Sequence, residues 1–230
     1  MEFVRQMLAQ ALDRIGSGDP ELLGVLARTL RLALESTALA LALGLPLGVW
    51  LGEARTRGRR VAVTLANAGL GLPPVVIGIY LALMLRPHAV LGGLGWSYTM
   101  SAMILAQTLL ALPIVVALTA AAVAGLPAGL LDQARAFGAS APAREVLALR
   151  EARVGVVAAA AAALLSAIAE VGAVVLVGGN VRGNTNTLTS TVLLDLSSGD
   201  AVGATASVLV LLALTLIVGG SLTLVQQRAR

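Results

Sequence analysis

The stretch GLLDQARAFGASAPAREVLALREAR, residues 129–153, is a polar, arginine-rich segment between two long apolar runs. The runs cover residues 100–125 and 154–177, and each is longer than the roughly 20 apolar residues that a helix needs to cross the hydrocarbon core of a bilayer. A helix-prone polar segment between two such runs is held on one side of a membrane. The pattern therefore predicts a surface that is displayed to a partner.

The composition supports a membrane location. The 230 residues are 58% hydrophobic and 12% charged, whereas soluble domains are about 45–50% apolar and about 25% charged. The chain has no cysteine and a single histidine, His88, which excludes a disulfide framework and a metal site built from Cys or His. The net charge of +4 comes from arginine without lysine, and no basic stripe with interleaved aromatics is present, so we expect no nucleic-acid partner.

Five apolar segments reach spanning length, which predicts an all-α integral membrane protein with five transmembrane helices. The first segment contains Glu35 and the fourth contains Glu170. Prolines at Pro46, at 73–74 and at Pro113 can kink three of the segments, because proline removes a backbone hydrogen bond. The expected spans are residues 32–51, 61–85, 100–125, 154–177 and 201–225.

Arginine is unevenly distributed between the two sides of these spans. Ten arginines lie in the first loop, the third loop and the C-terminal tail, and six lie on the other side. Loops rich in arginine stay in the cytoplasm, so we expect the N-terminus outside and the C-terminus in the cytoplasm. The ten are Arg55, Arg57, Arg59, Arg60, Arg135, Arg144, Arg150, Arg153, Arg228 and Arg230.

The first 28 residues form an N-terminal arm. Apolar residues within 1–15 recur at helical spacing, which predicts an amphipathic helix on the membrane surface. Asp19, Pro20 and Glu21 then mark a helix start, with an N-cap, a proline at the first helical position and an acid favoured by the helix dipole. We expect the arm, residues 1–28, to lead into a single transmembrane domain that covers residues 1–230.

Within residues 130–153, the spacing D-Q-A-x-x-x-G places Asp132 six residues before Gly138. Glycine permits a sharp backbone turn, so we expect two short helices joined at Gly138. Phe137 at this turn would be an exposed aromatic anchor for a partner's pocket. The candidate docking residues are Asp132, Gln133, Ala134, Phe137, Gly138 and Ala139.

This spacing resembles the EAA motif of permease subunits of ATP-binding-cassette (ABC) importers. That motif reads E-A-A, three residues, then G, in the cytoplasmic loop that docks on the ATPase subunit. Asp132 and Gln133 stand in place of the usual Glu and Ala, and Arg150-Glu151 stands near the Leu-Pro of many members. Five spans with this loop between the third and fourth are the layout of type I importers. The resemblance implies that fold, with residues 130–153 as the cytoplasmic coupling segment.

A second stretch is similar to the oxyanion-type permeases for molybdate and tungstate. SAIAEVGA at 166–173 and GGNVRGNTNTL at 178–188 look like the E-[FV]-G-A and G-N-x-x-G-x-T-x-T-L runs of those permeases. The particular form, with Arg182 in place of Pro, resembles the tungstate type most. Glu170 in the fourth span, and the stretch rich in Gly, Asn and Thr at its external end, are candidates for the translocation path or gate, and the alternative for that stretch is an ordinary loop. The candidate residues are Glu170, Gly172, Gly179, Asn180, Arg182, Gly183, Thr185 and Thr187.

The resemblance implies an importer that moves an oxyanion, tungstate first and molybdate next, across the plasma (inner) membrane. Its implied partners are a second copy of this chain in a homodimer, two ABC ATPase subunits, an extracytoplasmic oxyanion-binding protein and membrane lipid. The sequence contains no G-x-x-x-x-G-K-[ST] nucleotide motif. We therefore expect ATP and Mg in the ATPase, no cofactor in this chain, and no enzyme activity of its own.

Two interpretations of the charged residues stay open. An ionisable residue inside a span must face protein or water, so Glu170 is either part of a gate or a hydrogen-bond clamp that fixes helix packing. Arg31 pairs either with Glu35, one helical turn away, or with Glu170 across helices. The alternative to an ABC importer is an ion-coupled secondary carrier that uses Glu35 and Glu170 as relay groups.

Overall fold

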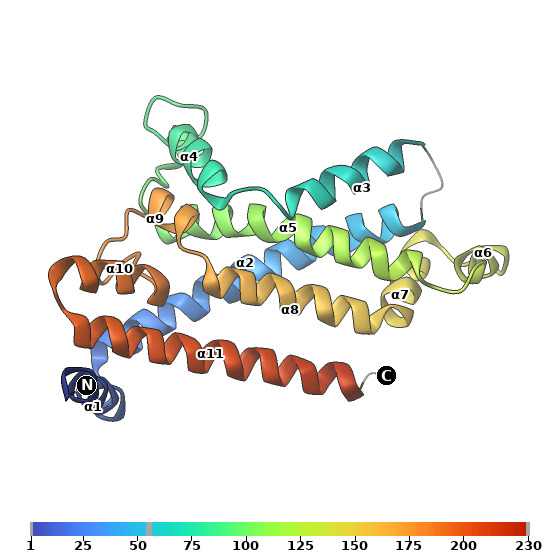
Figure 1. Cartoon of the computed structure of the whole chain (residues 1–230). Coiled ribbons are helices and arrows are strands. Elements are labelled where there is room, and N and C mark those ends of the chain that lie inside the picture. The colour runs from blue at the N-terminus through green and yellow to red at the C-terminus, as the bar shows by residue number, and fades with distance from the viewer. Residues whose placement is uncertain (1, 54–56, 229–230) are drawn as a thin grey trace. The chain divides into compact units, whose positions relative to one another are not determined.

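The computed structural model describes residues 2–53 and 57–228, and these residues fold into helices and turns without a strand (Figure 1). The predicted all-α class is confirmed. The elements in chain order are α1 (Glu2–Gly16), α2 (Pro20–Glu53), α3 (Arg57–Gly69), α4 (Pro74–Met84), the 3-10 turn η1 (Gly92–Leu94), α5 (Met100–Ala124), α6 (Leu130–Ala136), α7 (Ala141–Glu151), α8 (Arg153–Ala169), α9 (Gly172–Gly178), α10 (Leu188–Ser198) and α11 (Ala201–Arg228).

Three of the described helices are long and apolar enough to cross a membrane, namely α2, α5 and α11 through Ser221. Two bent helix pairs, α3 with α4 and α7 with α8, raise the number to five if each pair is counted as one span. The first, third and fifth expected spans therefore correspond to continuous helices. The total of five transmembrane helices stays a prediction.

The second and fourth expected spans are wrong as continuous helices. The second is broken between Gly69 and Pro74, because Pro73 is extended (φ −62°, ψ 124°) and a proline disfavours helical backbone in the residue before it. The fourth ends at Ala169 and resumes as α9 at Gly172. By contrast, Pro46 and Pro113 lie inside unbroken α2 and α5.

Some of the arginines on which the expected membrane orientation is based are not among the residues that the structure describes. Arg55 and Arg230 are not among the described residues, and the side chains of Arg57, Arg60 and Arg228 are likewise outside it. Arg59, however, is described and donates from Nε to the carbonyl of Leu51 at 2.6 Å.

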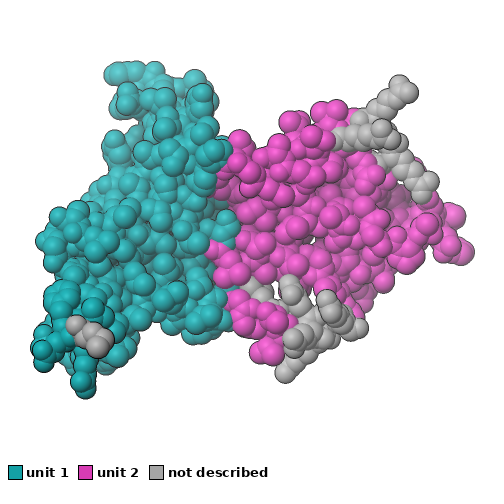
Figure 2. Space-filling view, in the orientation of Figure 1, with its two compact units in different colours: residues 1–36, 73–107, 166–218 teal, residues 37–72, 108–165, 219–230 magenta. Residues whose placement is uncertain are grey.

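The chain divides into two compact units (Figure 2). Unit 1 comprises residues 1–36, 73–107 and 166–218, and unit 2 comprises residues 37–72, 108–165 and 219–230. Each unit therefore combines three segments that are distant in the sequence. Spans that packed only against their neighbours in the chain would not give this division.

In unit 2, a stripe of glycines on α2 lets α5 approach closely. Gly44, Gly48 and Gly52 follow one another at four-residue spacing and thus share one face of the helix. A Cβ added at Gly48 would lie 2.6 Å from Cβ of Thr119, and one at Gly52 would lie 2.6 Å from Cβ of Val123. Small residues hold membrane helices together because they allow backbones to touch where no hydrophobic force drives association.

In unit 1, the N-terminal arm is fixed to the rest of the unit. The predicted helix is confirmed as α1, whose Ala11 is fully buried in a core with Leu22 and Val25 of α2, Leu188 of α10 and Ala206 of α11. The predicted start of α2 is also confirmed, because the backbone N–H of Glu21 donates to Asp19 Oδ1 at 2.8 Å. Elsewhere in this unit α9 packs against α4 (Figure 1).

Replacing Gly48 with alanine tests the close helix contact. The added methyl group meets Thr119 and the Val116 carbonyl, 3.1 Å away, so overpacking should cost about 1–3 kcal/mol and lower the thermal unfolding midpoint in detergent. Gly219→Ala is the matched control, because a Cβ there meets nothing within 4 Å and alanine is the better helix former. Equal losses in both variants would contradict close packing as the role of the stripe.

Candidate functional site

The coupling segment, residues 130–153, forms two short helices joined at Gly138, as predicted. Gly138 has a φ of +83°, which favours glycine. Its N–H donates to the Arg135 carbonyl and the N–H of Ala139 donates to the Ala134 carbonyl, each at 3.0 Å. These two bonds form a Schellman motif, which satisfies the last carbonyls of α6 and reverses the chain.

The segment is anchored on one side and exposed on the other. Leu131 of α6 and Ala148 and Leu149 of α7 pack in unit 2 against Val49 of α2 and Val123 of α5. The second helix begins at a regular N-cap, where Ser140 Oγ accepts from the N–H of Ala143 at 3.4 Å. The turn is thus held in place by apolar contacts and by its own backbone.

Phe137 stands at the tip of the turn with 90% of its surface exposed. An aromatic side chain is rarely left so open without a partner, because large apolar surface gains free energy when it is buried. Asp132, Gln133 and Gly138 are exposed beside it, while Ala134 and Ala139 are half-buried. The six candidate docking residues therefore lie on α6 and on the turn that follows it.

The second group of candidate residues, 170–187, lies in unit 1. Glu170 sits in the break between α8 and α9, not inside a continuous helix as the sequence suggested. Its Oε1 accepts from the N–H of Ala173 at 3.1 Å, and its carbonyl accepts from Thr189 Oγ1 at 3.0 Å. A side chain that bonds to nearby backbone competes with the helical ladder, which explains why the helix stops here. These contacts are those of a hydrogen-bond clamp.

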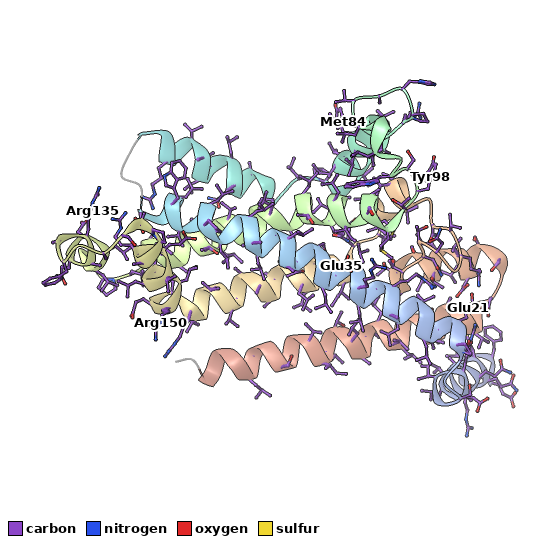
Figure 3. All side chains as sticks on the ribbon, turned by 180° about the vertical axis from the view of Figure 1, so that it is seen from behind. Glu21, Glu35, Met84, Tyr98, Arg135 and Arg150 are labelled. Atoms are coloured by element: carbon purple, nitrogen blue, oxygen red, sulfur yellow. The ribbon has the colours of Figure 1, made fainter. Side chains whose placement is uncertain are left out.

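Glycines allow close approach at both ends of α9, which follows this break. A Cβ added at Gly172 would lie 3.0 Å from Cγ2 of Val75, and one at Gly179 would lie 2.6 Å from the ring of Tyr98, which Figure 3 labels. Gly179 and Gly183 have φ values of +70° and +80°. The glycines among the candidate path or gate residues thus have a structural reason to be small.

Hydrogen bonds connect polar residues of 178–187 to one another and to α10. Thr185 Oγ1 donates to the Gly178 carbonyl at 2.6 Å and accepts from the N–H of Val181 at 2.9 Å. Asn180 Nδ2 donates to the Ser190 carbonyl at 3.1 Å. Thr187 caps α10 in a capping box with Ser190. The loop is therefore held by its own hydroxyls and amides, although the buried Oδ1 of Asn180 has no hydrogen-bond partner among the described residues.

Arg182 binds two carboxylates in this structure. Its guanidinium donates to Glu21 Oε1 at 2.7 Å and to Asp195 Oδ1 at 2.8 Å, and these bonds raise its pKa above the usual value. Figure 3 labels Glu21 at the start of α2. The same glutamate accepts from Arg14 at 3.3 Å through its other oxygen. Arg182 is thus part of an ion-pair network that ties 178–187 to α2 and α10.

Sequence reasoning missed two members of this region. Arg28 of α2 donates to the Gly183 carbonyl at 3.3 Å, to the Asn186 carbonyl at 3.1 Å and to Asn186 Oδ1 at 2.9 Å. Asn186 is fully buried and also accepts from the N–H of Gly183. The partners of Arg28 lie 155 or more residues away in the sequence. The one available sequence signal was the unusual position of an arginine directly before the first apolar run.

Arg31 pairs with Glu35, the nearer of its two expected partners. The Nε to Oε1 distance is 2.8 Å, and both side chains are well exposed (Figure 3 labels Glu35). The intrahelical alternative is confirmed.

Comparison with known proteins identifies the family. Residues 44–230 match the binding-protein-dependent transport system inner membrane component family. The chain belongs to this family. Its members are permease subunits of ABC importers and are not enzymes, and nucleotide binds to a separate ATPase subunit. The importer prediction is confirmed, and the ion-coupled carrier with Glu35 and Glu170 as relays is set aside.

Two curated relatives and one solved structure illustrate the match. A "probable anion ABC transporter permease protein" of Haloferax volcanii is 37% identical over 200 residues, 85% of this chain and 86% of the relative. A "tungstate uptake system permease protein TupB" of Peptoclostridium acidaminophilum is 28% identical over 99% of this chain and 100% of the relative. An inward-facing structure of the MetNI methionine ABC transporter has a TM-score of 0.74 at 21% identity, covering 91% of this chain and 96% of that one. This last likeness confirms the type I permease fold.

Replacing Gly138 with valine should separate insertion from assembly. A β-branched residue at φ +83° is strained, so the Schellman turn should open and Phe137 should move. We expect the variant to insert into the membrane normally but to lose co-purification with its ATPase subunit and to lose transport. Gly125→Val, in the connection between α5 and α6, is the control, because its φ lies outside the left-handed region. Wild-type assembly of Gly138→Val would refute the docking role of the turn.

Arg28→Ala should loosen the 183–186 turn. The change removes three hydrogen bonds to Gly183 and buried Asn186, at a cost of about 1–3 kcal/mol. The measurement is thermal unfolding in detergent, with Arg5→Ala on an exposed position of α1 as the control. An unchanged midpoint for Arg28→Ala would show that the turn does not depend on this arginine.

Proposed function

We propose that this chain is the permease of an oxyanion importer whose substrate is tungstate, with molybdate as the second candidate. The observation that carries the proposal is its 37% identity, over 85% of its length, to a permease named for anions. The full-length alignment with a permease named for tungstate favours that ion. The sequence run at 166–188, which resembles oxyanion-type permeases, agrees with this assignment.

The chemistry of residues 178–187 fits a pathway that does not retain its substrate. The loop offers hydroxyls and amides, and its one arginine, Arg182, is already held by Glu21 and Asp195. A fixed unpaired guanidinium would bind a divalent oxyanion tightly and slow its release. In this proposal, the extracytoplasmic binding protein selects the oxyanion with high affinity, and the permease forms the pathway across the membrane.

The proposed gate consists of Glu170, Gly172, Gly179, Asn180, Arg182, Gly183, Thr185 and Thr187. In support, the residues belong to one hydrogen-bonded region of unit 1 at a break between helices, where backbone can change conformation more easily than inside a helix. Glu170 is the central residue of the proposed gate, because its carboxylate accepts from the first turn of α9 and its carbonyl accepts from Thr189 of α10.

The proposed assembly is a homodimer of this chain with two ATPase subunits and one extracytoplasmic binding protein. Membership of the family implies ATPase and binding-protein partners. The homodimer rests on the argument that one such chain would form only half of a pathway. The orientation, N-terminus outside and C-terminus in the cytoplasm, is supported by the excess of arginine in the first and third loops and in the tail.

ATP hydrolysis in proteoliposomes that contain this chain and its ATPase tests the substrate. The binding protein would be added empty, and then loaded with tungstate, molybdate or sulfate at equal concentration. We expect tungstate-loaded protein to stimulate hydrolysis most and molybdate-loaded protein next, because loaded binding protein shifts the permease between its two states. Stimulation by sulfate alone, or by no oxyanion in a complex shown to be assembled, would overturn the proposal.

A further inference from the structure

Unit 2 contains a cavity of about 600 Å³ beside the coupling segment. Its walls come from the last turn of α2, from α3, from the connection between α5 and α6, and from both helices of the segment. The charged side chains among its described lining residues are Glu53, Arg59, Asp132, Arg135 and Arg144.

Three guanidinium groups therefore meet at this cavity from three different helices. Arg59 comes from α3, Arg135 from α6 and Arg144 from α7, against the two carboxylates of Glu53 and Asp132. The bond from Arg59 Nε to the Leu51 carbonyl fixes the first of these groups at the wall. Among the described lining residues the guanidinium groups outnumber the carboxylates by one, and bringing like charges together costs free energy that a bound anion can offset.

The chemistry and size of the cavity indicate its ligand. A guanidinium group matches the spacing of oxygens on a tetrahedral oxyanion and binds them in pairs. The volume lies in the range of small-molecule sites, about 300–1,000 Å³, which leaves room for more than a bare ion. Trp50 lines the same cavity and is 62% exposed, and exposed tryptophan at the end of an apolar helix is typical of the membrane–water interface.

We propose that this cavity binds a phosphate-type oxyanion, carried by an anionic phospholipid headgroup or free in solution, through Arg59, Arg135 and Arg144. The bound group would link α3 to the coupling segment and so stiffen the surface that bears Phe137. The site is distinct from residues 170–187, and its existence does not depend on which oxyanion the importer moves.

The test is the thermal unfolding midpoint of the purified full-length chain in mixed micelles. Phosphatidylglycerol is compared with phosphatidylcholine at equal mole fraction, and inorganic phosphate and tungstate are compared with chloride at equal ionic strength. The variant is Arg135→Gln with Arg144→Gln. Arg150→Gln is the matched control, because Arg150 is an exposed arginine of the same segment outside the cavity lining (Figure 3).

We expect phosphatidylglycerol to raise the midpoint of the wild type and of Arg150→Gln, and to leave the double variant unmoved. Each lost charge-assisted bond should weaken binding about tenfold. The same pattern with phosphate or tungstate, and none with the lipid, would support the site with a free anion as its ligand. Equal shifts in all proteins, or no shift with any probe, would overturn the proposal.

Glu53→Gln provides a second route if the double variant fails to fold. This change removes a negative charge from the lining and should lower the probe concentration needed for half of the maximal shift by several-fold. An unchanged or higher concentration requirement would count against the site.

Discussion

Close contact between α2 and α5 is the constraint on which unit 2 depends. Inside a membrane, burial of apolar surface gives helices little reason to associate, so packing at short range must hold them. Gly44, Gly48 and Gly52 supply that packing by removing every side chain from one face of α2. The contact places Val49 and Val123 next to each other, and the coupling segment is built on these two residues. The position of Phe137 thus follows from glycines that lie far from it in the sequence.

Unit 1 depends instead on hydrogen bonds and ion pairs between buried polar groups. Buried Asp195 binds Arg182, buried Asn186 binds Arg28, and the hydroxyl of Thr29 accepts from the N–H of Leu188. A buried polar group without a partner costs about 1–3 kcal/mol, so a network of this kind favours one arrangement of its segments. In a permease that alternates between two states, such a region can be expected to move as a whole.

The sequence was most informative where local chemistry decides the structure. Gly138 and the Asp19-Pro20 helix start could be predicted, because each depends on residues within one helical turn. The breaks in the second and fourth spans show the limit. Apolar length alone predicted continuous helices, whereas the pair Pro73-Pro74 and the side chain of Glu170 interrupt them. The contacts of Arg28 could not be predicted, because they join segments more than 150 residues apart. The roles of the candidate gate residues stay predictions.

Every cation in the network of unit 1 is a guanidinium, which keeps its proton at any pH that a cell meets. Arg14 holds Asp19 in an ion pair and keeps the pKa of that carboxyl below its usual value. The stabilisation from this pair is therefore complete above the ordinary aspartate pKa and declines only as the pH falls through the lowered value. Alkaline conditions, which would discharge a lysine network, leave these contacts intact. The ion pair between Arg14 and Asp19 is thus insensitive to pH from weakly acidic to alkaline surroundings, a tolerance that comes from arginine in place of lysine.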